Sequence, residues 1–392
     1  TKNALSLIGT QGGKIDVGEY SPGSEYAPFS SHLNFLGVPI PYWYYVAGNN
    51  LIKEQIPTKR EMENELVVFL EERINECDFE KFYEQGFYVD LGTPEISVEI
   101  EDLEVSVSVS ADVLAHKEER SARKTNHEVI VNSQLGKFYK LATEIYDKEK
   151  EDAFLEEYAI DVLRLNAPVD GVEVQCSPAI WKTQEVVDNL RNSLESNFAS
   201  LKFEGNYYDL NEKDDEYFVI NQYVDEPVNL LYLADAFPSK IEITPASEAV
   251  MMAEPVGNQE GMGIMGFCYV PYHFVYDVSF PVLVQIGDGI DMFQFPLSVI
   301  IDNNLPRVAE LSGIVEEEGP DVCGFREGSA TIYTYNTNLN PVEADISYEC
   351  FDNSCYLGKT EESGTGGILE TEIPLCVNGY LVANAEGYAQ EK

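Results

Sequence analysis

Seven cysteines are the residues of this 392-residue sequence whose chemistry can be read most directly. They are Cys77, Cys176, Cys268, Cys323, Cys350, Cys355 and Cys376, and no two of them form a CxxC pair. Only four histidines accompany them, none at a metal-ligand spacing from a cysteine, which argues against zinc. Disulfides are the better use of such cysteines, and they indicate an oxidising compartment outside the cytoplasm.

The positions of the cysteines predict two groups and one odd member. We expect Cys176 to pair with Cys268, and the last four cysteines to pair among themselves. Four cysteines allow three connectivities. A bridge from Cys350 to Cys355 across the FDNS turn is favoured, which leaves Cys323 with Cys376.

Four other motifs resemble known sites but lack part of what the chemistry needs. The GMGIMG segment at 261–266 matches the GxGxxG dinucleotide fingerprint, yet an apolar strand follows it where a helix should. His127 and Glu128 lack the second histidine of a zincin motif. His273 stands between aromatic residues and is expected to be a core or sheet-edge histidine. The acidic run at 209–216 lacks the glycine and the terminal glutamate of an EF-hand.

Acidic residues dominate the charge of the chain, with 69 of them against 25 basic residues and a formal charge of −44. Such a charge repels nucleic acid and anionic membranes, so neither is expected as a partner. Carboxylate pairs are too common in this composition to indicate an active site, so the chain is predicted not to be an enzyme. We expect no cofactor and no built metal site, and leave only casual calcium binding to the acidic surface open. The charge fits either a high-salt habitat or an ordinary acidic secreted protein.

One basic cluster, HKEERSARK at 116–124, departs from this acidity. It is expected to be a solvated loop that interrupts a ribbon of strands. The alternative is that it docks on the acidic face of a neighbouring subunit.

The elements that carry these residues follow from periodicity. Helical spacing predicts a first helix that ends at Gly12 and Gly13, a helix opened by a capping box of Thr58 and Glu61, two helices after Leu135, and another that starts at Ser177 and Pro178. Alternation predicts strands at 39–46, 96–109 and 172–176, and over most of 203–303. No apolar run approaches the length that spans a bilayer.

The domain organisation is expected to be α+β, with antiparallel sheets and packed helices followed by a small all-β sandwich. We predict an α+β domain at 1–132, a second α+β domain at 133–310 and a β-sandwich at 311–392, joined by the Glu-rich linker near residue 315. The last domain is too short for a large core, so disulfides are expected to stabilise it.

Two parts of the sequence resemble known families. The segments PVEADISYEC, GGILETEIPLC and GYLVANAEGY are similar to a carboxypeptidase-regulatory-like β-sandwich in a cysteine-bearing form found on archaeal cell surfaces. The earlier part, with ALSLIGTQGG, YEQGFYVDLGTPEISVEIEDLEVSVSV, CSPAIW and YHFVYDVSFPVLV, resembles surface proteins of small-genome archaea. Members of that family begin with a pilin-like hydrophobic helix, which would stand just before Thr1.

The resemblance implies an extracellular structural or surface protein: a membrane-anchored, filament or surface-layer subunit that associates with itself or with other surface proteins. The alternative is an adhesin or binding module that recognises a partner cell or a carbohydrate. Any membrane contact would run through the helix upstream of Thr1. In that family a cysteine stands near the end of the helix, so Cys77 is expected either to bridge to it or to be a buried free thiol.

Overall fold

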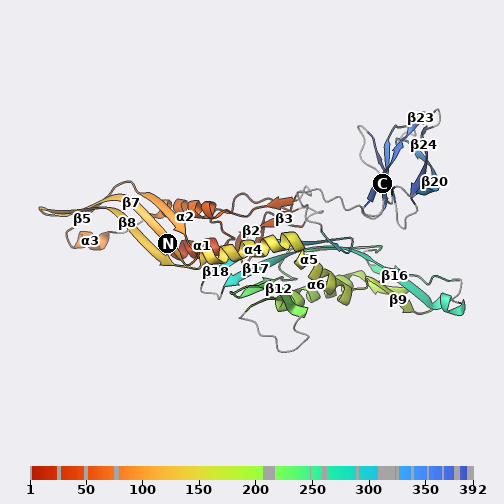
Figure 1. The fold of residues 1–392 in the computed structure, drawn as a ribbon, viewed down its shortest axis with the longest axis horizontal. Helices are drawn as coiled ribbons and strands as arrows, with labels where there is room; N and C mark the ends of the chain where they lie inside the picture. Colours follow the sequence, from red (N-terminus) through yellow and green to blue (C-terminus); the bar gives the residue numbers. More distant parts are fainter. Residues whose placement is uncertain are drawn as a thin grey trace. The chain divides into compact units, whose positions relative to one another are not determined.

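The chain forms two compact units in a computed structural model, Thr1–Ala309 and Glu310–Lys392 (Figure 1). Mixed α+β structure is confirmed, with a β-rich second unit. The structure describes residues 2–23, 28–47, 52–74, 79–205, 217–247, 249–257, 263–287, 291–307, 323, 326–336, 340–350, 353–363, 366–374 and 380–385.

A seven-stranded sheet forms the centre of the first unit. Its strands are β13 (Val228–Leu231), β17 (Val275–Gly287), β18 (Met292–Asp302), β3 (Tyr44–Val46) and β4 (Ile52–Glu54) in that order, with β14 (Lys240–Thr244) on β17 and β19 (Leu305–Pro306) on β18. The middle strands β17 and β18 are buried over most of their length. Their run of β-branched and aromatic residues suits strands that are covered on both faces.

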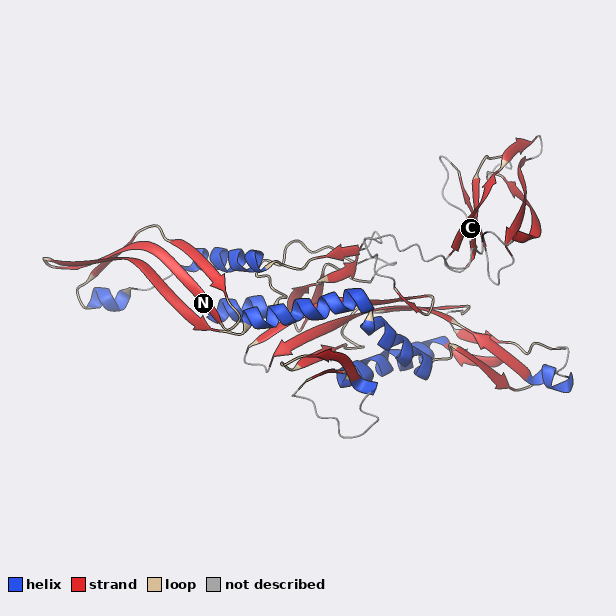
Figure 2. Ribbon diagram, in the orientation of Figure 1, coloured by secondary structure: helices blue, strands red, loops and turns tan. Residues whose placement is uncertain are grey.

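Four helices lie against this sheet (Figure 2): α1 (Lys2–Thr10), α4 (Leu135–Asp152), α5 (Phe154–Asn166) and α6 (Thr183–Ser200). Helix α2 (Lys59–Ile74) packs on α1 and on strand β6 (Glu95–Ile100), and the short α3 (Glu80–Glu84) lies beside strand β5 (Tyr88–Leu91). The predicted capping box opens α2: the Glu61 carboxylate accepts the Thr58 backbone N–H at 2.6 Å, and the Thr58 hydroxyl accepts the Glu61 N–H at 3.2 Å. The two helices predicted after Leu135 are also confirmed, and a left-handed Ala153 separates them.

The buried Trp43 fixes the end of α1 to the central sheet. Its ring stacks on Phe295 with centroids 4.1 Å apart, and its indole N–H donates to the Gly12 carbonyl at 2.9 Å. Gly12 and Gly13 have φ of 67° and 90°, a conformation that ends a helix and favours glycine. The strand predicted at 39–46 is two strands, β2 (Val38–Pro41) and β3, because β2 pairs with β1 (His32–Phe35) while β3 joins the central sheet.

The helix predicted to start at Ser177 and Pro178 begins six residues later, at Thr183. Residues Ala179–Lys182 instead form β10, which pairs antiparallel with β15 (Val250–Ala253). A partner strand some seventy residues away leaves no local signal, so the Ser-Pro helix-start pattern was misleading here.

The predicted boundary between residues 132 and 133 is wrong. One hydrophobic core contains Val105 and Val107 from before that boundary together with Phe138 and Ile145 from after it. The two expected α+β domains therefore form one unit. The structure has a single boundary between compact units, and it lies between residues 309 and 310.

Two neighbouring carboxyl groups lie at the junction of α4 and α5. Glu156 is 5% exposed, and its Oε1 accepts the Ile300 backbone N–H at 3.0 Å. Oε2 of Glu149 accepts the Leu155 N–H at 3.0 Å. Desolvation raises the pKa of Glu149 well above its usual range, and the neighbouring Glu156 raises that pKa further. Desolvation also raises the pKa of Glu156, so the pair holds a proton that an exposed glutamate would have lost.

We expect Glu149→Gln to flatten the pH dependence of stability. A carboxyl group whose folded pKa is raised contributes stability below its unfolded pKa of about 4.3, and this contribution is lost as the pH rises through the folded pKa. The free energy of unfolding of the wild type should therefore fall from pH 5 to pH 8 more steeply than that of the variant. Urea unfolding at several pH values measures the slope, with Glu151→Gln on the exposed side of α4 as control. Equal slopes for wild type and Glu149→Gln would contradict the assignment.

The second unit is a sandwich of two three-stranded sheets. One has the order β20 (Arg326–Thr334), β24 (Gly366–Pro374), β23 (Glu361–Ser363), and the other β22 (Asn353–Lys359), β21 (Asp345–Cys350), β25 (Tyr380–Asn384). Its core is small, with Ala344, Ile346, Tyr348, Cys355 and Leu357 at its centre.

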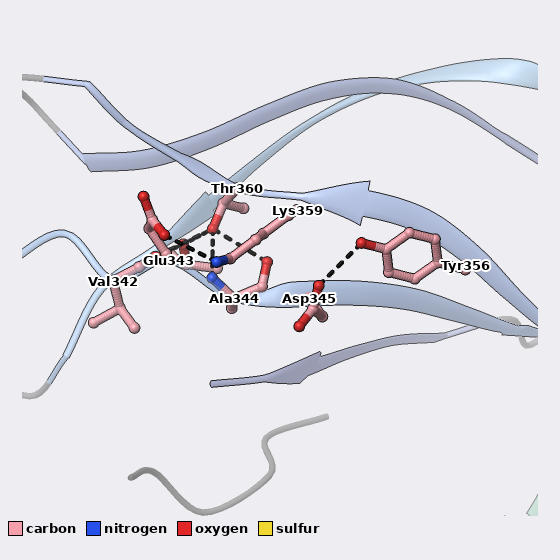
Figure 3. Close-up of polar contacts among 8 residues, drawn as sticks. Val342, Glu343, Ala344, Asp345, Tyr356, Lys359 and Thr360 are labelled. Carbon is pink, nitrogen blue, oxygen red and sulfur yellow. Dashed lines mark hydrogen bonds and ion pairs between the residues drawn. The ribbon is translucent and has the colours of Figure 1, made fainter. Parts of the chain in front are cut away.

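The fully buried Thr360 joins the segment that follows β22 to the segment that precedes β21 (Figure 3). The hydroxyl of Thr360 accepts the Ala344 N–H at 2.9 Å and donates to the Val342 carbonyl at 3.1 Å. Beside it, Lys359 pairs with Glu343 at 2.9 Å. The contacts of Thr360 satisfy buried polar groups that the small apolar core could not, whereas the Lys359–Glu343 pair is exposed.

The disulfides follow the predicted grouping, but the pairing within the second unit differs from the predicted one. Cys176–Cys268 is confirmed, with Cα atoms 3.9 Å apart. In the second unit Cys323 pairs with Cys355, so the favoured Cys350–Cys355 bridge is wrong. The register explains this: Cys355 lies opposite Tyr348 and only diagonal to Cys350, and diagonal positions are roughly 7–8 Å apart, beyond the usual disulfide span. Because Cys323 pairs with Cys355, the expected bridge from Cys323 to Cys376 is wrong as well. Cys77 lies outside the described residues, so the two roles expected for it stay predictions.

Candidate interaction site on the β7–β8 hairpin

The sequence motifs weighed for chemistry lie apart from one another. Residues 263–266 of the glycine-rich segment belong to a 3₁₀ helix, Gly263–Cys268, which leads into strand β16 (Tyr269–His273). His273 is an exposed sheet-edge residue whose ring bonds the Asp170 carboxylate, and His127 lies on strand β8. The acidic run at 209–216 is outside the described residues. Within the described part of the chain, no three metal-ligating side chains gather in one place.

The feature that stands out is a long hairpin that projects from the first unit (Figure 1). Strand β7 (Glu104–Lys117) runs to a turn at Glu118 and Glu119, and β8 (Arg120–Asn132) returns beside it. On its other side β7 pairs with β5 (Tyr88–Leu91) and β6 (Glu95–Ile100). Among the described residues β8 has no strand on its outer side, so every second residue of this thirteen-residue strand presents its backbone donor and acceptor at a sheet edge.

The alternation of the sequence explains why the base of the hairpin is fixed and its tip is not. Val105 and Val107 of β7 are buried in the core of the unit. A bulge between Ser110 and Val113 then changes the register, and beyond it nearly every residue of β8 is exposed. The hairpin is thus held at its base and extends into solvent toward Glu118.

The basic cluster predicted to be a solvated loop is the tip of this hairpin. Lys117 donates to the Gln85 carbonyl at 2.6 Å and lies 5.0 Å from the centre of the Phe87 ring. Arg123 forms a two-point ion pair with Asp112. The loop prediction was wrong because the two-residue turn is made of glutamates, with Glu118 at φ 53°, where glycine or asparagine would have signalled a hairpin.

Two cations at the tip of the hairpin have unpaired side chains. Arg120 and Lys124 are exposed and have no ion-pair or hydrogen-bond partner within the described part of the chain. They are four residues apart on one strand, so they share a face of the sheet, while Arg123 lies on the other face. Arg123 is paired with Asp112, so the unpaired positive charge of Arg120 and Lys124 lies on one face of β8, on a chain whose formal charge is −44.

Exposed apolar side chains accompany these cations. Tyr88 is 65% exposed and stacks on His116, with ring centroids 5.3 Å apart. Val129 and Ile130 of β8 are 52% and 55% exposed. An open strand edge with cations and apolar side chains is suited to contact with another protein. The three consecutive β-branched residues at 129–131 were the sequence signal that could have revealed this strand.

Comparison with known proteins adds no relative: no family model, no curated protein and no solved structure matches the chain. No helix within the described residues combines the length and apolar character needed to cross a membrane.

Proposed function

We propose that this chain is a subunit of an extracellular structural or surface assembly, and that copies of it join through the open edge of β8. The observation that carries the proposal is the combination of a thirteen-residue strand edge with unpaired Arg120 and Lys124. Unprotected edges pair readily with further strands, and proteins that stay monomeric usually block them.

Charge supports a second copy as the partner. The chain carries 69 acidic against 25 basic residues, so two copies repel each other in most orientations at low salt. The cations at the tip of the hairpin attract acidic residues of another copy. Complementary charge of this kind determines the orientation of a contact and the choice of partner. The notion that this cluster docks on a neighbouring subunit, one of two alternatives from the sequence, is thereby favoured.

An extracellular setting is supported by the two disulfides, which persist in oxidising compartments. The membrane anchor or filament helix upstream of Thr1 and the archaeal family belong to the proposal through the sequence resemblance. The high-salt habitat belongs to it through the formal charge of −44. A non-enzymatic role is proposed with them.

We expect Arg120→Glu with Lys124→Glu to weaken self-association by at least about tenfold, which is roughly 1.4 kcal/mol. Reversal of both charges replaces attraction for an acidic neighbour by repulsion. Sedimentation velocity across a concentration series, at one fixed NaCl concentration, measures the association constant.

The matched control is Lys59→Glu with Arg60→Glu, two exposed cations at the start of α2. This control makes the same charge change outside the β7–β8 hairpin and should associate as the wild type does. Equal association of the β8 variant and the wild type would remove the β8 edge from the proposal.

The second candidate function, an adhesin or binding module, is supported only by exposed tyrosines on the second unit. Tyr333 on β20 and Tyr356 on β22 are 56% and 57% exposed, and exposed tyrosines suit carbohydrate contacts. They belong to different sheets of the sandwich. Retained assembly together with lost cell or glycan binding in Tyr333→Ala would favour this role.

A further inference from the structure

A second projecting ribbon lies at the other end of the first unit (Figure 1). It consists of β9 (Asp170–Val174) paired with β16, and β10 paired with β15, and the Cys176–Cys268 disulfide closes it. The inner faces of the two pairs pack on each other through Ala179, Ala253 and Val270. We call this two-layered structure the distal ribbon.

The outer faces of the distal ribbon are apolar and exposed. Val174 is 69% and Val172 45% exposed on β9, while Ile180 on β10 and Met252 on β15 are 60% and 48% exposed. Phe267, which follows the glycine-rich segment, is 57% exposed. Apolar side chains in such number on so small an element indicate a contact surface.

Strand β9 is also an open edge, and it is acidic. Within the described residues β9 pairs only with β16, so its other edge has no partner. Asp170 and Glu173 are three residues apart and therefore project from opposite faces of the strand. The β8 edge carries the unpaired cations Arg120 and Lys124, so the two edges are complementary in charge.

We propose that β8 of one copy pairs edge to edge with β9 of the next copy, which joins the units head to tail. This inference rests on the proposed function and names the surface that receives β8. Two different patches at opposite ends of one unit make a heterologous contact, and such contacts continue into open filaments unless a rotation closes them into a ring.

The test is a charge swap between two variants. The first carries Arg120→Glu and Lys124→Glu on β8, and the second carries Asp170→Lys and Glu173→Lys on β9. Each alone opposes like charges across the contact, so each should associate at least about tenfold more weakly than the wild type. In an equal mixture, the natural β8 of the second variant faces the natural β9 of the first, and the acidic β8 of the first faces the basic β9 of the second. Both contacts then join opposite charges, so the association constant of the mixture should lie within about threefold of that of the wild type. The loss of the exposed Asp170–His273 contact should cost little stability.

The outcomes separate this inference from the proposed function. If the β8 variant is weakened and the β9 variant is not, β8 still joins copies but β9 does not receive it. If neither variant is weakened, the β8 interface fails and this inference fails with it. Binding of the wild type to neutral lipid vesicles, lost in Phe267→Ser while assembly is unchanged, would assign the distal ribbon to a membrane surface and overturn the inference. Glu71→Lys with Glu72→Lys, exposed on α2, controls for the gain of positive charge.

Discussion

Replacement of both Cys323 and Cys355 by serine is expected to unfold the second unit while the first stays folded. This bridge closes a loop of 32 residues. Its loss raises the entropy of the unfolded chain and thereby lowers the free energy of unfolding by about 3–4 kcal/mol. A small β-sandwich has a total stability of only about 3–5 kcal/mol. Among the described residues its core is centred on five buried side chains, which offset little of the loss.

Calorimetry of the full chain should show this as the loss of one of two transitions. The matched control is Cys176→Ser with Cys268→Ser, which removes the other bridge and should leave the transition of the second unit unchanged. Hydrogen exchange at residues 345–349 and 355–359 reports the same event locally, because those strands form one sheet. An unchanged second transition in the Cys323 and Cys355 variant would contradict the view that the disulfide stabilises this unit.

The second large effect is a rise in thermal stability with salt. Self-repulsion among the excess negative charges destabilises the folded chain, and the Debye length falls from about 10 Å at 0.1 M to about 3 Å at 1 M salt. We expect the melting midpoint to rise by roughly 5–10 °C between dilute buffer and molar NaCl.

Salt also weakens attractive ion pairs, so the sign of the effect depends on which contribution is larger. The described residues contain eight ion pairs, of which five join two exposed side chains and three have one half-buried partner, and an exposed pair contributes about 0.2–1 kcal/mol. Relief of repulsion should exceed that loss. A midpoint that is unchanged or lower in molar NaCl would show that repulsion does not limit stability.

Local patterns predicted the elements whose signals are contained within one segment. The capping box of Thr58 and Glu61 and the helical spacing after Leu135 are examples, because a helix makes its hydrogen bonds within a few residues. The alternation at 96–109 likewise specified two strands and the buried face that includes Val105.

Features that depend on distant partners could not be predicted in the same way. Strand β10 forms only because β15 pairs with it, and the Cys323–Cys355 bridge depends on the register of β21 and β22. The carboxyl pair of Glu149 and Glu156 is invisible among so many acidic residues until the helices fold against β18. The basic cluster at 116–124 was visible in the sequence, but its place on an open strand edge required the structure.

Cryo-electron microscopy of the concentrated wild-type protein tests the central claim, assembly through β8, most directly. The account predicts ordered filaments or sheets in which the β8 edge of each copy lies against a neighbouring copy. Samples across a range of NaCl concentrations would keep low-salt repulsion from hiding the contact. Particles that stay monomeric in every condition, or an ordered array in which β8 faces solvent, would contradict it.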